Sequence, residues 1–359
     1  MIGQGLLLLG VLGLATGFAW LLMFRVRAYL ERRHVLDIPN ERSSHSRPTP
    51  RGGGLAIVAI TLAGWVFLVP LVARASVRGA AVYAVGGLFI ALVSWLDDRR
   101  SVKYIYRLAI HIALACMVVN SLGYWQMVQL PLLGHVSLGV LGLPITLVWL
   151  VGLVNAYNFM DGIDGLAGGQ AVVAGLTWGL LGWLTGQTGV ALLGVLLAGS
   201  SLGFLTHNWP PARVFMGDVG SAFLGFSFAA LPLLFAAGTP ASGEQVARAP
   251  LCGAVMVWPF VFDATFTFVR RCVKGERVFD AHRSHLYQRL VILGLSHQSV
   301  TLLYMVHSVV GASLAVSWLL ALGSPDIMVL AGLPILSAAL CGCVPLGRRW
   351  RLLSRGAQD

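Results

Sequence analysis

Long apolar segments recur along almost the whole chain, with short polar stretches between them. Apolar residues make up 57% of the sequence and charged residues 11%, whereas soluble domains carry about 25% charged residues. A helix needs about 20 mostly apolar residues to span a bilayer. Eleven segments approach that requirement: 4–24, 53–73, 80–96, 105–122, 141–157, 169–185, 187–206, 219–237, 250–269, 297–320 and 326–346. Because the gap near 186 is short, the division there stays open. The pattern predicts an all-α, polytopic integral membrane protein, with residues 1–359 as one membrane domain.

Basic residues are distributed unevenly between the segments. The formal net charge is +11, which on its own would suggest nucleic acid as a partner. If the N-terminus lies outside, all but three of the 25 Lys and Arg residues fall on the inner side; the exceptions are Arg74, Arg78 and Arg248. Such a bias is the positive-inside signal of membrane proteins. It predicts an external N-terminus and a cytoplasmic C-terminus, and it assigns the charge to topology rather than to nucleic acid.

Polar residues gather in five places, 37–54, 97–107, 155–168, 207–221 and 280–289. Under the predicted topology all five lie on the cytoplasmic side. A transporter is expected to place ionisable groups near the middle of the membrane, between broken helices. The observed placement favours chemistry at the inner surface instead.

An acidic pair, Asp97 and Asp98, closes the third apolar segment. Negative charge at a helix C-terminus opposes the helix dipole, so an adjacent pair is unfavourable unless something compensates it. One interpretation is an ion pair with Arg99, Arg100 or Arg107. The other is a role as general base or metal anchor, because adjacent carboxylates push their pKa values apart.

Amide and carboxylate side chains recur at three-residue spacing after the fifth segment, as Asn155, Asn158, Asp161 and Asp164. They are interpreted either as polar contacts between helices around a glycine turn, or as ligands beside glycines that let the backbone approach a phosphate or sugar. Asp218 opens the eighth segment, where it is either a helix N-cap or a ligand for a hard cation. Mg²⁺ takes oxygen ligands, commonly one or two carboxylates plus substrate phosphate. Asp161 or Asp164 is the expected second carboxylate.

The loop after the ninth segment contains His282, Arg283 and His285, followed by Arg289. Single histidines are usually structural, but this group is typical of a phosphate-binding site. Asp263 is expected either to pair with Arg270 or to face the active site. Six other histidines are expected to be ordinary structural residues: His34, His111, His135, His207, His297 and His307.

The first inner loop, 37–54, is rich in proline, glycine and basic residues. It is interpreted either as a topology signal that touches anionic lipid or as part of a substrate site. In the second interpretation His45 and Arg47 bind substrate.

The motifs together carry a resemblance that none carries alone. In order from Asp37 to Arg289 they are D-x-P-N-x-R-S-S-H with P-T-P-R-G-G-G, D-D-R, N-x-x-N-F-M-D-G-I-D-G, F-M-G-D-x-G-S and H-R-S-H. This set resembles the polyprenyl-phosphate N-acetylhexosamine-1-phosphate transferase family, also called glycosyltransferase family 4. The resemblance implies transfer of a sugar-1-phosphate from a UDP-linked N-acetylated sugar to undecaprenyl phosphate, with release of UMP. It also implies Mg²⁺ dependence, with Mn²⁺ as the alternative cation, and an active site on the cytoplasmic face of the bacterial inner membrane.

The expected site follows from these motifs. Catalytic roles are expected for Asp97, Asp98, Asp161 and Asp164, and metal binding for Asp218 and Asp161. Substrate binding is expected for Asn155, Asn158, His282, Arg283, His285, His45 and Arg47. Membrane lipids are further expected partners, and a homodimer is compatible with the resemblance.

Within the family, the chain is more similar to initiators of O-antigen and related polysaccharides than to phospho-MurNAc-pentapeptide transferases. The latter carry Lys where this chain has Ser101, and a histidine-rich H-H-H-x-E loop where it has H-R-S-H. Leu286 and Tyr287 also depart from the H-I-H-H of the GlcNAc branch, which leaves the sugar open among GlcNAc and 6-deoxy sugars such as QuiNAc or FucNAc. The alternatives are a pentapeptide transferase, a lipid-linked sugar flippase and a non-catalytic scaffold.

Overall fold

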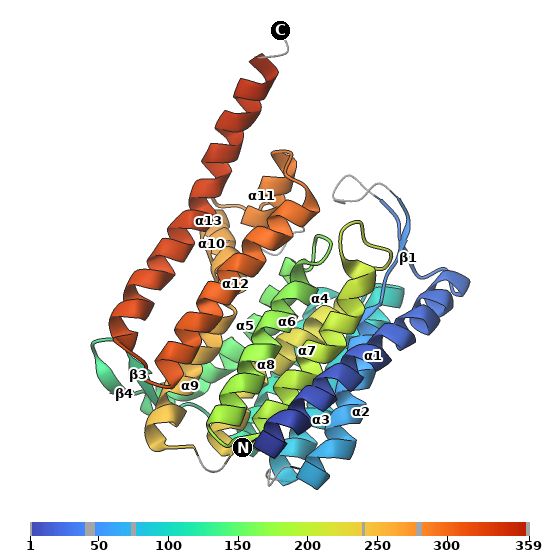
Figure 1. The fold of residues 1–359 in the computed structure, drawn as a ribbon. Helices are drawn as coiled ribbons and strands as arrows, with labels where there is room; N and C mark the ends of the chain where they lie inside the picture. Colours follow the sequence, from blue (N-terminus) through green and yellow to red (C-terminus); the bar gives the residue numbers. More distant parts are fainter. Residues whose placement is uncertain (1, 40–46, 73–76, 239–240, 278–281, 357–359) are drawn as a thin grey trace.

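The computed structural model describes residues 2–39, 47–72, 77–238, 241–277 and 282–356, with side chains as far as residue 343. The described residues are predominantly helical, which confirms the all-α prediction (Figure 1). The helices are α1 (Ile2–Arg32), α2 (Gly54–Val72), α3 (Val77–Arg100), α4 (Tyr104–Leu122), α5 (Gly142–Met160), α6 (Leu166–Leu184), α7 (Thr188–Asn208), α8 (Asp218–Ala237), α9 (Gly243–Met256), α10 (Trp258–Val273), α11 (Leu286–Ile292), α12 (His297–Leu319) and α13 (Pro325–Gly356). Two short antiparallel hairpins join them, β1 (Leu36–Asp37) with β2 (Thr49–Pro50), and β3 (Met127–Leu130) with β4 (Gly134–Ser137).

Among the described residues, nine helices are long and apolar enough to cross a membrane, or ten if the bent pair α9–α10 counts as one span. The remaining predicted segment, 169–185, is α6, whose glycines, Gln170 and Thr177 lower its hydropathy. This helix packs closely on α7: a Cβ at Gly175 would lie 2.8 Å from the carbonyl oxygen of Gly194. Its small and polar residues therefore face protein rather than lipid.

The predicted segment 250–269 is not one continuous helix. The chain breaks at Val257, and α9 and α10 meet at a bend of 71°. Pro259 lies in the first turn of α10, where its missing N–H leaves no helical hydrogen bond to continue α9. Gln170 compensates for part of this loss by donating to the Met256 carbonyl oxygen at 3.2 Å. The break turns α10 away from the direction of α9, and α10 carries Asp263.

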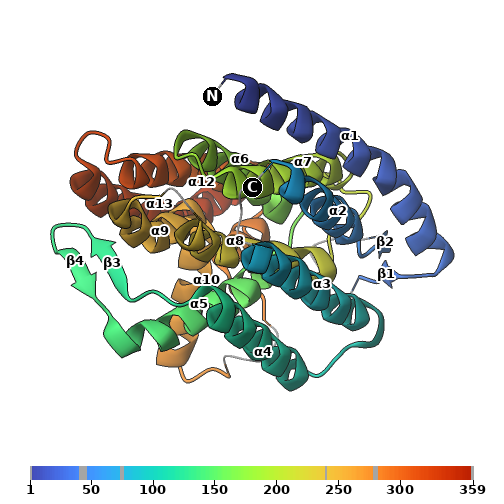
Figure 2. The ribbon, with the colours of Figure 1, turned by 90° about the horizontal axis from the view of Figure 1, so that it is seen from below.

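The connections that contain the five polar clusters gather at one end of the bundle. In Figure 1 this is the upper end, where α1, α3, α5 and α7 finish and α6, α8 and α12 begin. The N-terminus and the β3–β4 hairpin lie at the opposite end, which Figure 2 shows face on. Placement of the polar clusters at one surface is thereby confirmed. Which surface faces the cytoplasm stays a prediction.

The helix α8 is almost entirely surrounded by other helices, whereas α1 lies at the edge of the bundle (Figure 2). The contacts of α8 with α2, α3, α4 and α5 bring one end of each of these helices to the N-terminus of α8. The polar end of α8 is therefore the point at which the candidate site forms.

Candidate active site

The glycine-rich end of the first loop fixes the segment that leads into α8. The backbone N–H of Gly53 donates to the carbonyl oxygen of Phe215 at 2.9 Å, and that of Gly54 donates to Met216 at 2.8 Å. A Cβ on Gly54 would lie only 2.2 Å from the Cα of Gly220, so the two backbones approach as closely as they do because both residues are glycine. Two motifs that are far apart in sequence thus form one unit.

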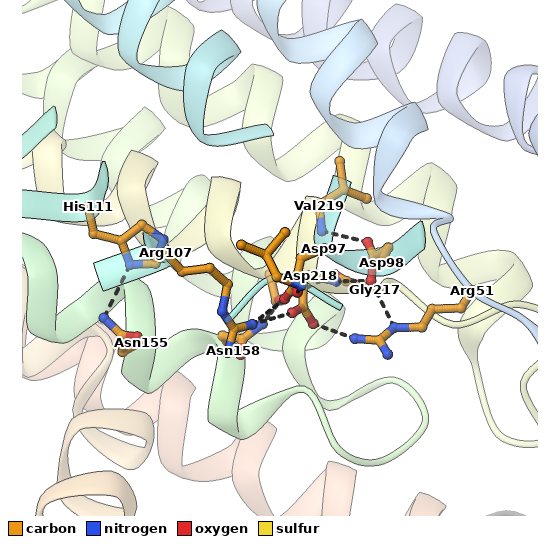
Figure 3. A network of polar contacts seen from close by, with 12 residues as sticks. Arg51, Asp97, Asp98, Arg107, His111, Asn155, Asn158, Gly217, Asp218 and Val219 are labelled. Atoms are coloured by element: carbon orange, nitrogen blue, oxygen red, sulfur yellow. Dashed lines mark hydrogen bonds and ion pairs between the residues drawn. The ribbon is translucent and has the colours of Figure 1, made fainter. Parts of the chain in front are cut away.

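Asp98 caps the N-terminus of α8 from a neighbouring helix. Its Oδ1 accepts the backbone N–H of Asp218 at 2.9 Å, and its Oδ2 accepts that of Val219 at 3.0 Å (Figure 3). The Nε of Arg51 lies 2.9 Å from the same Oδ1, and the Asp98 side chain is fully buried. Gly217 completes the turn with φ of 76°, in the left-handed region that favours glycine. Both oxygens of Asp98 are therefore committed to holding α8 in place.

Two arginines bracket the carboxylate of Asp218. Nη2 of Arg51 lies 2.5 Å from Asp218 Oδ1, and Nη1 of Arg107 lies 3.0 Å from Oδ2 (Figure 3). Arg107 also pairs with Asp97, whose Oδ1 accepts the backbone N–H of Val102 at 2.6 Å. The predicted pairing of the acidic pair with Arg107 is thus confirmed for Asp97.

The acidic neighbours of Arg51 stabilise its positive charge. Burial acts to lower its pKa, but the carboxylates of Asp218 and Asp98 outweigh burial and raise the pKa above its ordinary value. Arg51 is therefore a permanent cation between two anions, and it reduces the repulsion between them.

Asp161 differs from the other acids because its side chain has no hydrogen bond or ion pair within the described part of the chain. It ends α5, where its backbone N–H donates to the carbonyl oxygen of Asn158 at 3.3 Å. Burial raises its pKa well above the ordinary value; Arg51 opposes this, while the charge of Asp218 adds to it. Asp161 thus interacts electrostatically with the Asp218 cluster, but no basic side chain forms an ion pair with its carboxyl group in the described part of the chain.

These acids suit a hard cation by charge and by ligand type. Three paired carboxylates, Asp97, Asp98 and Asp218, share two arginines, and Asp161 adds a fourth carboxyl group that interacts electrostatically with this cluster. In the described ranges no three His, Cys, Asp or Glu side chains form a complete metal cage. Mg²⁺ does not need one, because it commonly takes one or two carboxylates and fills its remaining positions with water and phosphate oxygens.

Asp164 is bound on three sides. Its Oδ2 accepts the backbone N–H of Ala212 at 3.0 Å, and its Oδ1 lies 3.3 Å from Nδ1 of His297 at the start of α12. Its carbonyl oxygen accepts the hydroxyl of Thr301 at 2.8 Å. These contacts join α12 and the 209–213 loop to the acidic turn. A catalytic role for Asp164 stays a prediction. His297 also belongs to this part of the site, although nothing in the sequence around it indicates such a role.

The two predicted amide ligands connect helices. Nδ2 of Asn155 donates to the carbonyl oxygen of Val151 at 2.7 Å and lies 3.4 Å from Nδ1 of His111 on α4 (Figure 3). Nδ2 of Asn158 donates to the hydroxyl of Ser221 on α8 at 3.0 Å. Both side chains lie at the acidic end of α5, and their binding of substrate stays a prediction. His111 is a second residue that sequence analysis missed.

The predicted phosphate-binding loop lies against the same end of α5. The hydroxyl of Tyr287 on α11 donates to the carbonyl oxygen of Phe159 at 3.0 Å, two residues before Asp161. His282 and His285 have ring centroids 5.0 Å apart, and Arg283 between them is partly buried.

The expected pair between Asp263 and Arg270 is wrong. Arg270 donates to the carbonyl oxygen of Ser284 at 2.5 Å, whereas Asp263 binds His285. The reason is the fold of the loop, which returns to α10 and places a histidine beside the acid. A helical spacing of seven residues could not indicate this.

Of the two predicted ligands in the first loop, the structure describes only Arg47, which is not part of this network. His45 lies outside the described residues. Arg47 is exposed, and its carbonyl oxygen accepts the Thr49 hydroxyl at 3.1 Å. The residue of this loop that enters the acidic cluster is Arg51, four positions further along the chain.

Comparison with known proteins agrees with this geometry. Residues 80–236 match glycosyl transferase family 4. The chain is 32% identical over 278 residues to a probable undecaprenyl-phosphate N-acetylglucosaminyl 1-phosphate transferase of Bacillus subtilis, covering 76% of this chain and 74% of that protein. It is 35% identical over 303 residues to the decaprenyl-phosphate N-acetylglucosaminephosphotransferase of Mycobacterium tuberculosis, covering 77% and 74%. It is 26% identical over 314 residues to the undecaprenyl-phosphate alpha-N-acetylglucosaminyl 1-phosphate transferase of Escherichia coli K12, covering 83% and 80%.

The family match contains the four carboxylates Asp97, Asp98, Asp161 and Asp218, and the relatives above 30% identity extend it over three quarters of the chain. By sequence and by the site it builds, this multi-pass membrane protein belongs to glycosyl transferase family 4.

Proposed function

We propose that this protein transfers N-acetylglucosamine-1-phosphate from UDP-GlcNAc to a polyprenyl phosphate, undecaprenyl phosphate in the first instance, and releases UMP. The observation that carries the proposal is the cluster of Asp97, Asp98, Asp161 and Asp218 around Arg51 and Arg107 at one end of the helical bundle. The three relatives named above act, by their names, on polyprenyl phosphates with N-acetylglucosamine-1-phosphate as the transferred group. Such a transfer needs positioning and charge neutralisation more than covalent participation by the protein.

The cofactor in this proposal is Mg²⁺, held by Asp218 and Asp161. Bound there, the ion neutralises charge on the donor diphosphate. The arginines on either side of Asp218 fix its carboxylate, so that it offers oxygen ligands in a constant position. Asp161, without a direct partner in the described chain, is the carboxylate most available to complete the set.

The acceptor base is assigned to Asp97 rather than Asp98. Both oxygens of Asp98 accept backbone N–H groups of α8, and its side chain is fully buried. Asp97 retains some exposure and has one basic partner, Arg107. A carboxylate in this position can orient the phosphate of the lipid or remove its proton, a contribution of about 10²–10⁴-fold in rate.

The donor diphosphate is assigned to the loop of His282, Arg283 and His285. The hydrogen bond from Tyr287 to Phe159 holds this loop against the end of α5. Phe159 lies two residues before Asp161 in the chain. Charge-assisted hydrogen bonds to phosphate are about twice as strong as neutral ones, which suits a loop with three cationic or protonatable groups. Asn155 and Asn158 are assigned to the sugar-nucleotide because they lie at the same helix end.

The reaction is placed at the cytoplasmic face of the bacterial inner membrane, as the initiating step of O-antigen or a related envelope polysaccharide. The positive-inside distribution supports this orientation, because the polar end of the bundle is also the basic end. The concentration of basic residues there raises the local concentration of anionic donor and lipid phosphate.

The test uses the full-length protein in detergent or nanodiscs with undecaprenyl phosphate, Mg²⁺ and a panel of UDP-sugars, scored for UMP release and for the lipid product. UDP-GlcNAc is expected to be the best donor, with UDP-QuiNAc and UDP-FucNAc as matched 6-deoxy alternatives. Preference for a 6-deoxy sugar would correct the substrate but not the reaction. Release of UMP only from UDP-MurNAc-pentapeptide, or no release from any donor, would overturn the proposal.

A further inference from the structure

Asp263 is a fully buried acid in α10 whose partners are all hydrogen-bond donors. Its Oδ1 accepts Nδ1–H of His285 at 3.2 Å, the backbone N–H of Leu286 at 2.9 Å and the hydroxyl of Thr267 at 3.1 Å. Its Oδ2 accepts the backbone N–H of Tyr287 at 3.1 Å and the hydroxyl of Tyr304 at 2.7 Å. A buried carboxylate in a membrane protein is expensive, and such residues are usually retained for function. No Lys or Arg pairs with Asp263 in the described chain, so its one protonatable cationic partner is His285.

This contact determines which nitrogen of His285 remains for other partners. An ionised carboxylate only accepts hydrogen bonds, so Nδ1 of His285 must carry the hydrogen that it donates to Asp263. Nε2 is then the nitrogen left for substrate. When the ring is protonated, Nε2–H can donate to a phosphate oxygen while Asp263 balances the charge. The rings of Phe159, His282 and Tyr287, with centroids 5.0–6.2 Å away, hold the imidazole in this orientation.

His282 is held in the opposite tautomer. The backbone N–H of Ser284 lies 3.4 Å from Nδ1 of His282 and the Ser284 hydroxyl lies 2.9 Å from it, so Nδ1 accepts and Nε2 carries the hydrogen. Burial, and then the positive charge of neighbouring side chains, lower its pKa to about 4. At neutral pH His282 is therefore a neutral donor. The two histidines of one motif have different chemical roles, and Asp263 makes the difference.

Asp263 also connects the loop to the acidic site. It accepts the backbone N–H of Tyr287, and the hydroxyl of the same tyrosine donates to the carbonyl oxygen of Phe159 at the end of α5. A Cβ on Gly162 would lie 2.1 Å from that hydroxyl, so the two segments are in tight contact. A shift of Asp263 would move His285 and Tyr287 together relative to Asp161.

We propose that Asp263 is a positioning residue for the donor: it holds His285 as the Nδ1–H tautomer, fixes the start of α11, and so leaves Nε2 of His285 to bind the diphosphate of the nucleotide-sugar. This role rests on the proposed function, because that function assigns the donor to this loop. The role of Asp263 is therefore distinct from that of the acidic cluster around Asp218. The ion pairs of that cluster do not include Asp263.

The kinetic test compares Asp263→Asn, His285→Gln and the control Tyr304→Phe. The control removes a hydrogen bond from the same carboxylate but leaves its contact with His285. Asp263→Asn is expected to raise the donor KM about tenfold or more, the effect of one charge-assisted hydrogen bond, and to change the acceptor KM less than about twofold. Tyr304→Phe is expected to change the donor KM less than about threefold. In the double variant, Asp263→Asn should add little to His285→Gln, because both act through the same imidazole.

Other kinetic outcomes would overturn the proposal. Equal rises in both KM values would indicate a general loss of structure, and additive effects in the double variant would separate Asp263 from His285. A donor KM that stays within twofold of wild type in Asp263→Asn would exclude the positioning role directly.

A spectroscopic test does not depend on turnover. In ¹⁵N-histidine-labelled protein, the signal of His285, assigned by its loss in His285→Gln, is expected to report Nδ1–H in wild type and a changed tautomer population in Asp263→Asn. A wild-type signal that shows hydrogen on Nε2 but none on Nδ1 would overturn the inference. If the wild-type protein releases no UMP, the proposed function fails, whereas the histidine spectrum still decides whether Asp263 sets the tautomer.

Discussion

The guanidinium of Arg51 lies 2.5 Å from the carboxylate of Asp218, although 167 residues separate them in the chain. The same guanidinium reaches Asp98 through its Nε at 2.9 Å. A planar guanidinium can bridge two carboxylates in fixed directions, whereas the single ammonium of lysine cannot reproduce both contacts. The last basic residue of the first loop therefore determines how two acids from α3 and α8 face each other.

Arg51→Lys is expected to reduce kcat/KM about tenfold or more while keeping the charge. The physical reason is the loss of one of two directed contacts, and charged hydrogen bonds of this kind contribute about 1.5–3 kcal/mol. The matched control is Arg27→Lys, because Arg27 pairs with Glu31 on α1, away from the acidic cluster. Equal activities for the two variants, measured by UMP release, would show that the bridging geometry is unimportant.

Asp98→Asn and Asp97→Asn are expected to fail in different ways. Asp98 caps two backbone N–H groups of α8 and holds Arg51, so Asp98→Asn should destabilise the protein by about 1–3 kcal/mol, the usual cost of weakening hydrogen bonds to a buried polar group. Asp97→Asn should instead reduce turnover by about 10²-fold or more with a smaller change in melting temperature. Melting temperature and turnover measured on both variants decide the matter. A stable, inactive Asp98→Asn would transfer the catalytic assignment to Asp98.

Asp218→Asn is expected to abolish most activity and to remove the stabilisation that Mg²⁺ gives. A ligand that binds the folded protein raises its melting temperature according to concentration and affinity, so wild-type protein should melt higher as Mg²⁺ is added. The variant should show little of this shift. Normal turnover of the variant at limiting Mg²⁺, or an unchanged Mg²⁺ shift, would exclude Asp218 as a metal ligand.

Gly162→Ala should destabilise the loop contact by about 1–3 kcal/mol, because an added methyl group must displace a close neighbour. The Cβ would lie 2.1 Å from the Tyr287 hydroxyl and 3.0 Å from the ring carbon that bears it. Tyr287→Phe in the same chain removes the first clash and should restore part of the lost stability and turnover. If the double variant is no better than Gly162→Ala alone, the Tyr287 contact is not the cause.

The parts of the fold that sequence predicted well are those that the bilayer imposes. Apolar length predicted the helices, and the polar clusters between them lie at one end of the bundle because alternate connections of a helical bundle must lie on the same side. The predicted segment 169–185 is a helix, α6, but its Gln170 and glycines keep it out of the nine helices apolar enough to cross a membrane, and these residues are buried against protein. The break at Val257 also escaped prediction, since a proline in the first turn of a new helix looks the same in sequence as one inside a long helix.

The motifs predicted which residues gather at the site but not how they divide the work. Asp98 and Asp97 are adjacent in sequence, yet one caps α8 and the other pairs with Arg107. His297 reaches Asp164 across 133 positions, and no local pattern records such a contact. Which side chains pair across helices depends on how the helices pack. The spacing of residues within one segment carries no information about that packing.

The pH dependence of stability should reveal the neutral state of His282. Burial is the main cause that lowers its pKa from 6.5 to about 4, and the positive charges of His285, Arg271 and Arg270 act in the same direction. The unfolded chain therefore binds a proton more readily than the folded protein between these two pH values. Stability from this group is complete above about pH 6.5 and is lost as the pH falls toward about 4.

The measurement is the difference in melting temperature between wild type and His282→Gln at several pH values. Glutamine keeps a polar side chain but does not titrate, so wild type should lose stability relative to the variant as the pH falls from about 7 to about 4.5. Other titrating groups affect both proteins and cancel in the difference. A difference that stays constant over this range would mean that folding does not lower the proton affinity of His282, and the assignment of a neutral donor at this position would have to be withdrawn.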